Sequence, residues 1–416
     1  MQLTFITVAV IGLCYFLFGK RRFDLFSVAF FSACVYFLPG FFGYALYPNL
    51  SSPNYYIGVP TNLVDEVYVI MMVVLFSIFF SGLYFDLTFR KKIEQPISIK
   101  GSKNAAIVAT GLAVIGCILA FLTIGKTLFF YDKAEVIKLI NRWVILWETA
   151  ASLGAVLAFV QSRRILFCIC MFLLLLEVYI GFRSAFAVTS IAIFCIWLNR
   201  KGKQRLAIKS WKVLILGLIF ALFVFIYKFL LLFVKMGDWQ TVTERLQKPE
   251  FYFSTIAESE PFTTQAILNE VVKTNFYVGL EHLKGIIYQF ILFSPELGAE
   301  VVSFNNLFQP NLFPGIGWGM ANNIWAEMWS SGGWNLLLSF IGIFVTLLFI
   351  GSSCLSRPVD PTIKGGIALF LTYWAFYIHR NDILYQLNLE KNVFLVWFAC
   401  VFISDLCSRV KLAHNS

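Results

Sequence analysis

Residues 165–199, which read ILFCICMFLLLLEVYIGFRSAFAVTSIAIFCIWLN, decide the fold class of this chain. Glu177 and Arg183 are the charged side chains in this stretch. The stretch divides into two apolar runs, 165–181 and 184–199, and the tight turn between them contains Arg183. A helix needs about 20 apolar residues to cross the hydrocarbon core of a membrane. The stretch therefore predicts two short membrane-spanning helices joined by a tight turn.

The composition of the whole chain has the same character. Of its 416 residues, 59% are hydrophobic and 13% are charged, about half the share of roughly 25% that is usual in globular proteins. A soluble domain could not bury the 46 phenylalanines and the other apolar side chains without exposing large apolar patches. The composition excludes a soluble globular enzyme, a disordered chain and a disulfide-rich secreted domain. It indicates an all-α, polytopic helical membrane protein.

Apolar runs along the chain predict about eleven transmembrane helices. Their approximate bounds are 2–19, 24–46, 66–87, 104–124, 143–160, 165–181, 184–199, 212–234, 333–351, 366–378 and 393–407. Positive charge follows the first run and does not precede it, so we interpret this run as a span that stays in the protein. With the N-terminus outside and the C-terminus inside, the inside segments hold 20 Lys and Arg residues and the outside segments hold 12. This N-out, C-in topology satisfies the positive-inside rule.

The predicted topology divides the chain into three parts. Residues 1–234 contain the first eight spans, residues 235–332 form one large external loop, and residues 333–416 contain the last three spans. The loop carries five Lys or Arg and ten Asp or Glu residues, and apolar residues occur throughout it. Its segment LEHLKGIIYQFILF, at 280–293, is too short for a full span. We therefore expect a helix at the membrane surface or a re-entrant segment there.

Two arginines are candidates for ligand binding on the outer face. Arg183 lies in the tight turn GFRS at 181–184, and Arg380 lies in the polar run IHRND at 378–382, at the outer end of the tenth span. A guanidinium group matches the oxygens of phosphate in a bidentate way, so each arginine could hold a phosphate or pyrophosphate. The alternatives are an interfacial anchor for Arg183 and an ordinary loop with an Arg–Asp pair around Arg380.

A third candidate is the segment GIGWGMANNIWAEMWSSGG at 315–333. Glycines let a ligand approach the backbone closely, and the faces of tryptophan rings suit sugar rings. Glu327 in this segment is a suitable carboxylate for orienting an attacking hydroxyl. The tryptophans could instead belong to an aromatic belt at the membrane interface. The candidate substrate-binding residues on the outer face are Arg245, His282, Trp318, Asn322, Asn323, Trp325 and His379.

Other common kinds of site are not supported by the sequence. It contains no GxxxxGKS/T phosphate loop and no nucleotide-binding fingerprint. Its single histidines and its nine cysteines, most of which lie in apolar runs, give no converging metal ligands and no disulfide framework. The net charge of +10 lies in short clusters between apolar runs, which is typical of membrane topology and not of nucleic-acid binding. We therefore expect no cofactor, no metal and no nucleic-acid partner.

The combination of these features resembles the O-antigen polymerases of the Wzy type. The shared features are about eleven spans, one large external loop late in the chain, an arginine at a short outer turn (Arg183), an outer Arg380 and Asp382, and a glycine-rich segment with a following Ala-Glu and Gly at 315–333. A pattern of Arg, ten residues and Gly that occurs in some family members is not met after Arg183, where Phe194 takes the glycine position, nor after Arg245. The resemblance implies a GT-C-like polymerase or ligase fold.

The resemblance also implies a function. Such proteins are metal-independent glycosyltransferases of the bacterial inner membrane that transfer a growing polysaccharide from undecaprenyl pyrophosphate to the next lipid-linked repeat unit, at a site facing the periplasm. The partners would be lipid-linked oligosaccharides, membrane lipids and a polysaccharide chain-length regulator. Arg183 and Arg380 would bind the pyrophosphate and stabilise its developing charge. Glu327 would act on the acceptor hydroxyl and Asp382 would provide orientation, so these four residues are the candidate catalytic residues.

Three other functions remain open. An O-antigen ligase shares the architecture and the donor but delivers the chain to a lipid A-core acceptor, and a histidine in the large loop, His282, favours it. A flippase or another transporter of lipid-linked oligosaccharides would show more polar or broken spans. An acyltransferase that modifies external sugars would need a better-placed histidine base.

Overall fold

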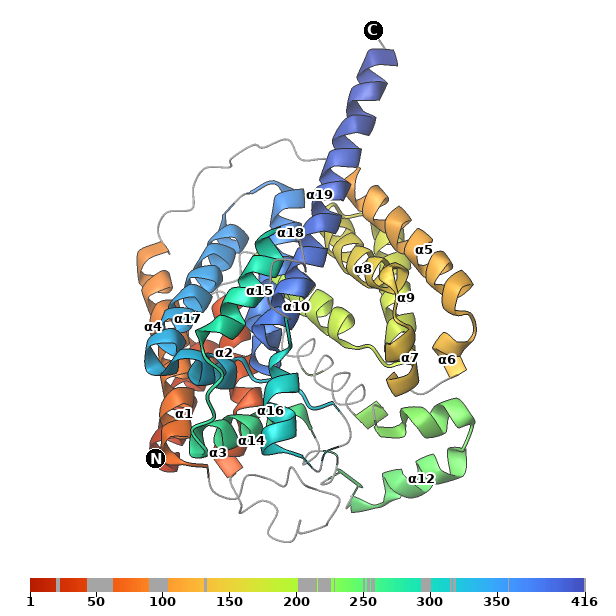
Figure 1. Cartoon of the computed structure of the whole chain (residues 1–416). Coiled ribbons are helices and arrows are strands. Elements are labelled where there is room, and N and C mark those ends of the chain that lie inside the picture. The colour runs from red at the N-terminus through yellow and green to blue at the C-terminus, as the bar shows by residue number, and fades with distance from the viewer. Residues whose placement is uncertain are drawn as a thin grey trace. The chain divides into compact units, whose positions relative to one another are not determined.

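The computed structural model describes residues 1–19, 23–42, 63–89, 104–130, 133–200, 215, 226–227, 229–249, 251–252, 255, 259–292, 301–314, 316, 319–357 and 359–414 (Figure 1). Every regular element in this part of the chain is a helix, which confirms the predicted all-α class there. Five helices are long and apolar enough to cross a membrane: α4 (Asp65–Phe89), α5 (Ala105–Ile124), α8 (Arg142–Val160), α17 (Ile324–Ser356) and α19 (Ile383–His414). Each coincides with or contains a predicted span. The total of eleven spans and the GT-C-like fold stay predictions.

The chain folds into two compact units, and each unit is built from segments that are separated in the sequence. The first unit contains Met1–Lys92, Ile256–Ser352 and Tyr373–Leu389. The second unit contains Ile93–Thr255, Ser353–Thr372 and Glu390–Ser416. The predicted parts 1–234, 235–332 and 333–416 concern membrane topology, which this division by packing does not test.

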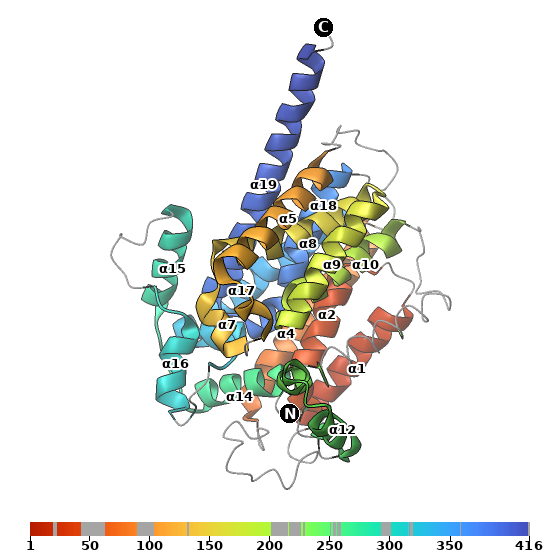
Figure 2. The ribbon, with the colours of Figure 1, turned by 90° about the vertical axis from the view of Figure 1, so that its right-hand side faces the viewer.

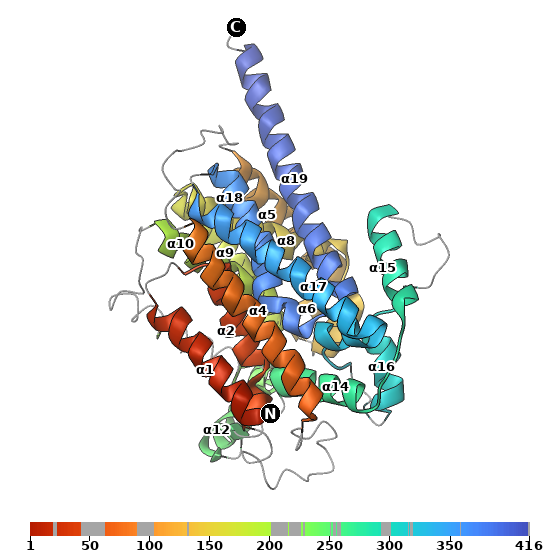
Figure 3. The same cartoon turned by 90° about the vertical axis from the view of Figure 1, so that its left-hand side faces the viewer.

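Phenylalanine rings hold the N-terminal helices of the first unit together. These helices are α1 (Gln2–Phe18), α2 (Leu25–Tyr36), α3 (Leu38–Phe42) and α4, and α1, α2 and α4 pack side by side (Figures 2 and 3). Phe16 on α1 stacks on Phe30 of α2 with ring centroids 4.7 Å apart. Phe85 on α4 packs edge-on against Phe349 of α17, with centroids 5.1 Å apart. Aromatic pairs of this kind stabilise packing beyond the burial of their area.

The remaining elements of the first unit are mostly short. They are α14 (Glu260–Lys273), α15 (Leu280–Leu292), α16 (Phe304–Leu312), the π-helix η2 (Tyr373–Tyr377), the 3-10 helix η3 (Ile378–Arg380), and the parts of α17 and α19 that belong to this unit. Helix α16 lies between α15 and α14 (Figures 2 and 3). Asn269 Oδ1 on α14 accepts a hydrogen bond from the backbone N of Val64 at 2.9 Å, so α14 is joined to the chain at the N-terminal end of α4. The segment predicted at 280–293 is indeed helical, while its position at the membrane stays a prediction.

The tenth predicted span, 366–378, is not one regular α-helix. Helix α18 (Pro361–Thr372) ends at Thr372, and the chain continues as η2 and η3. In the first unit, Ser32 Oγ on α2 donates a hydrogen bond to the Phe376 carbonyl of η2 at 2.6 Å. A side chain therefore satisfies a carbonyl of the widened helical turn. Short π-helices are frequent at functional sites, and this one leads directly into Arg380.

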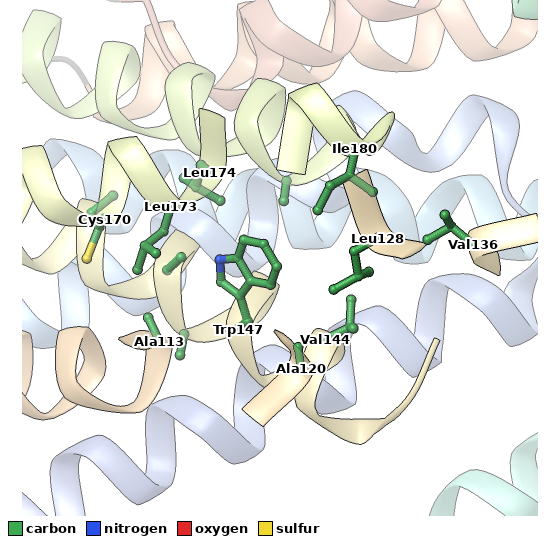
Figure 4. Packing of buried hydrophobic residues seen from close by; sticks show 14 residues of the cluster. Ala113, Ala120, Leu128, Val136, Val144, Trp147, Cys170, Leu173, Leu174 and Ile180 are labelled. Carbon is green, nitrogen blue, oxygen red and sulfur yellow. The ribbon is translucent and has the colours of Figure 1, made fainter. Parts of the chain in front are cut away.

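Small residues bring the central helices of the second unit close together. Its helices are α5, α6 (Thr127–Phe130), α7 (Lys133–Leu139), α8, α9 (Arg164–Ile180), α10 (Ser184–Arg200), α12 (Trp239–Gln247), α18 and the rest of α19. A Cβ at Gly116 on α5 would lie 2.7 Å from the backbone N of Trp147 on α8. Glycine at this position therefore allows the close approach of two helices that are long and apolar enough to cross a membrane. Trp147 lies in an apolar cluster with Leu173, Leu174 and Ile180 of α9 (Figure 4).

The structure describes two further predicted spans of this unit in full, and it describes only a small part of a third. The runs 165–181 and 184–199 form α9 and α10, joined by a turn in which Gly181 has a φ of 120°. The helices are confirmed, whereas their crossing of a membrane stays a prediction. Most of the predicted span 212–234 lies outside the described residues.

Candidate active site

The candidate site, which lies within the first unit, is built around the start of α17. Asn323 caps this helix, because its Oδ1 accepts hydrogen bonds from the backbone N of Trp325 at 2.9 Å and of Ala326 at 3.1 Å. Asn323 Nδ2 donates to the carbonyl of Thr264 on α14 at 2.8 Å. The cap therefore starts α17 and also fixes it to α14. Glu327 follows in the first turn of the helix.

Glu327 and His282 form a buried pair. Glu327 Oε1 lies 2.9 Å from His282 Nε2, and Glu327 Oε2 accepts a hydrogen bond from the backbone N of Ile383 at 2.7 Å. The exposed fraction is 0% for the Glu327 side chain and 7% for the His282 side chain. With Glu327 ionised, His282 Nε2 is the donor and Nδ1 is the basic nitrogen, which has no hydrogen-bond partner among the described residues. A carboxylate that orients an imidazole in this way is suited to general-base chemistry.

Asp382 connects two helices. Its Oδ1 accepts a hydrogen bond from the backbone N of Tyr385 in α19 at 2.8 Å, and its Oδ2 accepts one from the backbone N of Phe304 in α16 at 3.0 Å. Burial raises the pKa of Asp382, although these backbone hydrogen bonds oppose the shift. The predicted role of Asp382 in orienting Arg380 is therefore wrong, because both carboxylate oxygens face backbone N–H groups and Arg380 pairs with Glu260.

Arg380 pairs with Glu260, the first residue of α14. Arg380 Nη1 donates to Glu260 Oε2 at 2.6 Å, and the two side chains are 26% and 29% exposed. The guanidinium carbon lies 4.7 Å from the centre of the Tyr377 ring. Burial opposes the charge of Arg380, but Tyr377 and Glu260 outweigh it and raise the pKa, so the guanidinium stays cationic. The Arg380 carbonyl accepts a hydrogen bond from the backbone N of Asn322 at 3.1 Å, which joins Arg380 to the start of α17.

The residues of the candidate site lie in the first turns of five helices, or bind backbone groups there. The first turns of α14, α15, α16, α17 and α19 contribute, in that order, Glu260, His282, the Phe304 N–H, Glu327 and the Ile383 N–H. Each helix N-terminus carries a partial positive charge and can bind phosphate or another anion. In this structure the groups that lie at these partial positive charges are the carboxylates of Glu260, Glu327 and Asp382. The arrangement therefore places a candidate base among helix N-termini that can bind an anion.

His379 and Trp325 pack in the interior of the first unit. Both have 0% exposure, and Trp325 Nε1 donates a hydrogen bond to His379 Nδ1 at 3.1 Å. The rings of Tyr36, Phe37 and Phe344 lie around His379, with centroids 5.6–6.4 Å away. Burial lowers the pKa of His379 to about 3, which agrees with a neutral ring that accepts at Nδ1. This placement supports a structural role for both side chains in place of the predicted contact with substrate.

The other predicted site residues are distributed differently. Arg183 and Arg245 belong to the second unit, where Arg183 lies between α9 and α10. Arg245 on α12 stacks on Phe233, with Cζ 4.4 Å from the ring centre. Trp318 lies outside the described residues. A shared pyrophosphate site for Arg183 and Arg380 therefore stays a prediction.

Glu260 is the main site residue to which sequence reasoning assigned no role. The sequence Ser-Glu-Pro at 259–261 is typical of a helix start, because proline favours the first helical turn. The position of Glu260 at a helix N-terminus could thus have been found. Its pairing with Arg380, 120 residues further along the chain, leaves no local signal.

Comparisons with known proteins do not add to this geometry. No protein-family model matches the chain, and no curated protein and no solved structure matches it. Among the described residues, no group of three or more His, Cys, Asp or Glu side chains could hold a metal ion.

Proposed function

We propose that the chain is an O-antigen polymerase, a membrane glycosyltransferase that moves a growing polysaccharide from undecaprenyl pyrophosphate to the next lipid-linked repeat unit at the periplasmic face of the bacterial inner membrane. One observation carries the proposal: the N-terminal ends of α15, α17 and α19 meet at the buried His282–Glu327 pair, and the cationic Arg380 lies three residues before Ile383, whose backbone N–H binds Glu327. Transfer from a pyrophosphate needs a base for the acceptor and a positive field for the leaving group. The donor already contains its leaving group, so the reaction requires no nucleotide.

Each part of the site has a role in the proposed reaction. An acceptor hydroxyl attacks the anomeric carbon of the donor sugar, and a glycosidic C–O bond forms. The bond from that carbon to the pyrophosphate oxygen breaks, and the pyrophosphate leaves with the electron pair. The hydroxyl proton passes to His282 Nδ1, and Glu327 stabilises the imidazolium. Arg380 and the helix N-termini stabilise the charge that develops on the pyrophosphate. A single displacement of this kind inverts the anomeric configuration.

An O-antigen ligase is the second candidate. The observation that favours it is the placement of His282, a histidine of the predicted large loop, as the base of the pair with Glu327. A ligase would use the same donor and base, and it would deliver the chain to a lipid A-core acceptor. The two functions therefore differ in the acceptor and not in the chemistry of the site.

The deciding experiment uses a deletion strain of the native host and a gel of its surface polysaccharide. A deletion that leaves core with one repeat unit, restored to a ladder by the wild-type chain, supports a polymerase. Naked core with long chains stranded on the lipid carrier supports a ligase. Naked core without stranded chains contradicts both and indicates a flippase.

The same strain tests the base. Loss of a general base lowers the rate by about 10²–10⁴-fold, so His282→Ala should leave one repeat unit on the core. Glu327→Gln should also shorten the ladder, and the double variant should be little worse than His282→Ala because the two groups act as a unit. Glu281→Gln is the matched control, since this carboxylate on α15 is 84% exposed and should support a full ladder. A full ladder from a well-expressed His282→Ala variant would show that His282 is not the general base.

A further inference from the structure

Glu260 satisfies only part of the binding capacity of Arg380. The guanidinium group has five N–H donors in a planar fork, and Glu260 Oε2 takes one of them, at Nη1. Arg380 Nε is buried and has no hydrogen-bond partner among the described residues. A buried donor without a partner is unfavourable, more so when it is charged. The arginine can therefore accommodate a ligand with more acceptor oxygens than Glu260 offers.

The surroundings of Arg380 hold it in place and leave it reachable. Tyr377 covers the guanidinium at 4.7 Å, and Asn322 N binds the Arg380 carbonyl at 3.1 Å. In contrast to the fully buried Glu327, the side chains of Arg380 and Glu260 are 26% and 29% exposed. A solvent-borne anion can thus exchange with Glu260.

We propose that Glu260 occupies the place of the substrate anion on Arg380, and that the pyrophosphate group of the substrate displaces it. A pyrophosphate has more charge and more acceptor oxygens than one carboxylate, so it can use more of the guanidinium donors than the single one that Glu260 Oε2 takes. A sugar carboxylate has the same charge as Glu260 and gains no such advantage. Glu260 is the first residue of α14, so its side chain can move away without breaking the helix. The inference rests on the proposed function in taking a pyrophosphate as the ligand.

The test is a binding measurement on the full-length protein in lipid nanodiscs, titrated separately with inorganic pyrophosphate and with undecaprenyl pyrophosphate. Removal of the competing charge in Glu260→Gln should lower the Kd for inorganic pyrophosphate by about two- to tenfold. Arg380→Gln should raise the Kd at least about tenfold, and adding Glu260→Gln to it should bring no gain. The matched control is Glu270→Gln on the same helix, whose carboxylate lies 3.7 Å from Lys273 and should leave the Kd unchanged.

Each outcome decides a separate point. If Glu260→Gln binds both ligands more tightly than wild type, the proposal is supported and the pyrophosphate group alone is sufficient as the ligand. If it binds only undecaprenyl pyrophosphate more tightly, the proposal is supported and the ligand is the pyrophosphate of the lipid carrier. Unchanged or weaker binding by Glu260→Gln, or a gain that persists without Arg380, overturns it. Should Glu260→Gln fail to fold, Glu260→Asp shortens the reach of the carboxylate and should show the same direction. Binding is measured without turnover, so a wild-type chain that forms no ladder would refute the polymerase and leave this result standing.

Discussion

Asp382 shows how one carboxylate can fix the ends of two helices. Its oxygens accept hydrogen bonds from the backbone N of Phe304 and of Tyr385, so α16 and α19 share one capping side chain. The side chain has 0% exposure, and burial raises its pKa despite the two backbone bonds. The ionised form is thus less favourable in the folded protein than in the unfolded chain, because the cost of burying the charge exceeds the gain from the two backbone hydrogen bonds, which favour the carboxylate.

Two substitutions of Asp382 distinguish the contribution of its capping hydrogen bonds to stability from the contribution of its charge. Asp382→Ala should lower the free energy of unfolding by about 1–2 kcal/mol, because it removes a cap. Asp382→Asn keeps an acceptor oxygen and should cost less. Since the folded pKa of Asp382 is raised, its favourable contribution is complete at acidic pH and is lost as the pH rises through that pKa. The stability of Asp382→Asn relative to wild type should therefore increase with pH. Thermal unfolding in detergent across a pH series measures this, and parallel curves for both proteins would contradict it.

The sequence identifies the chemistry of single residues better than their partners. Glu327 and Arg380 can be selected because charged side chains are rare in this apolar chain and suit proton transfer and anion binding. Their partners cannot be selected in the same way. His282 lies 45 residues before Glu327, and Glu260 lies 120 residues before Arg380. Periodicity relates residues of one helix, whereas these pairs form because the ends of different helices converge.

Helix α17 is interrupted next to the candidate site. Its apolar pattern continues from Ile324 to Ser356, but Gly332 (φ −165°, ψ 21°) and Gly333 (φ 57°, ψ −150°) leave the helical conformation. Just before this break, the Ser330 carbonyl accepts a hydrogen bond from the backbone N of Val278 at 2.9 Å. Val278 leads into α15, so the break lies where the two helices that carry the base pair are joined.

Alanine at the break tests its importance. Gly333 has a positive φ, and nothing lies within 4 Å of a Cβ built there, so Gly333→Ala would act through backbone strain and not through a clash. We expect a loss of about 1–3 kcal/mol in stability and a shorter polysaccharide ladder. Gly342→Ala is the control in the same helix, since its Cβ also meets nothing within 4 Å and alanine favours a helix by about 0.5–1 kcal/mol. Equal melting temperatures for the two variants would show that the break is not needed.

Hydropathy predicts the bounds of α4, α5 and α8 closely, whereas α17 and α19 begin nine and ten residues before the predicted runs 333–351 and 393–407, and the irregular tenth segment is predicted poorly. The run predicted at 104–124 forms Ala105–Ile124, because a mostly apolar run of twenty residues without a charge leaves the backbone no better alternative than a helix. The run predicted at 366–378 passes from α18 into a π-helix and a 3-10 helix. A tertiary contact accompanies that change, the hydrogen bond from Ser32 to Phe376, and a hydropathy pattern does not contain such contacts.

At the scale of the whole molecule, the amino-acid composition predicts a helical membrane protein, and the distribution of Lys and Arg predicts its N-out, C-in topology. The division into two units is not predicted, because each unit combines segments far apart in the chain. Apolar character shows that a helix can be buried in lipid or protein, and it does not show which other helix it contacts. The candidate site illustrates the difference, since residues 259–327 and 380–383 meet in one unit although two predicted spans, 333–351 and 366–378, separate them in sequence.

The N-out, C-in topology makes a prediction for the whole chain. Tyr277 is 74% exposed between α14 and α15, in the predicted external loop. In a protein whose exposed Cys14, Cys168 and Cys407 are replaced by serine, Tyr277→Cys should react with a membrane-impermeant maleimide in intact spheroplasts, because the positive-inside rule places this loop outside. The same protein with Tyr277 retained gives the background labelling. A fluorescent protein fused after residue 416 should fluoresce, and alkaline phosphatase at that position should be inactive.

Labelling of Tyr277→Cys only after the membrane is opened would reverse the topology. The loop also contains His282 and Glu327, so the candidate base would then face the cytoplasm. Repeat units that have already reached the outer leaflet could not meet it, and the proposed polymerase would fail even if Arg380 still bound pyrophosphate. Labelling before opening places the base on the side where the lipid-linked substrates are expected. The orientation of one exposed residue thus determines whether the chemistry argued for the site can take place.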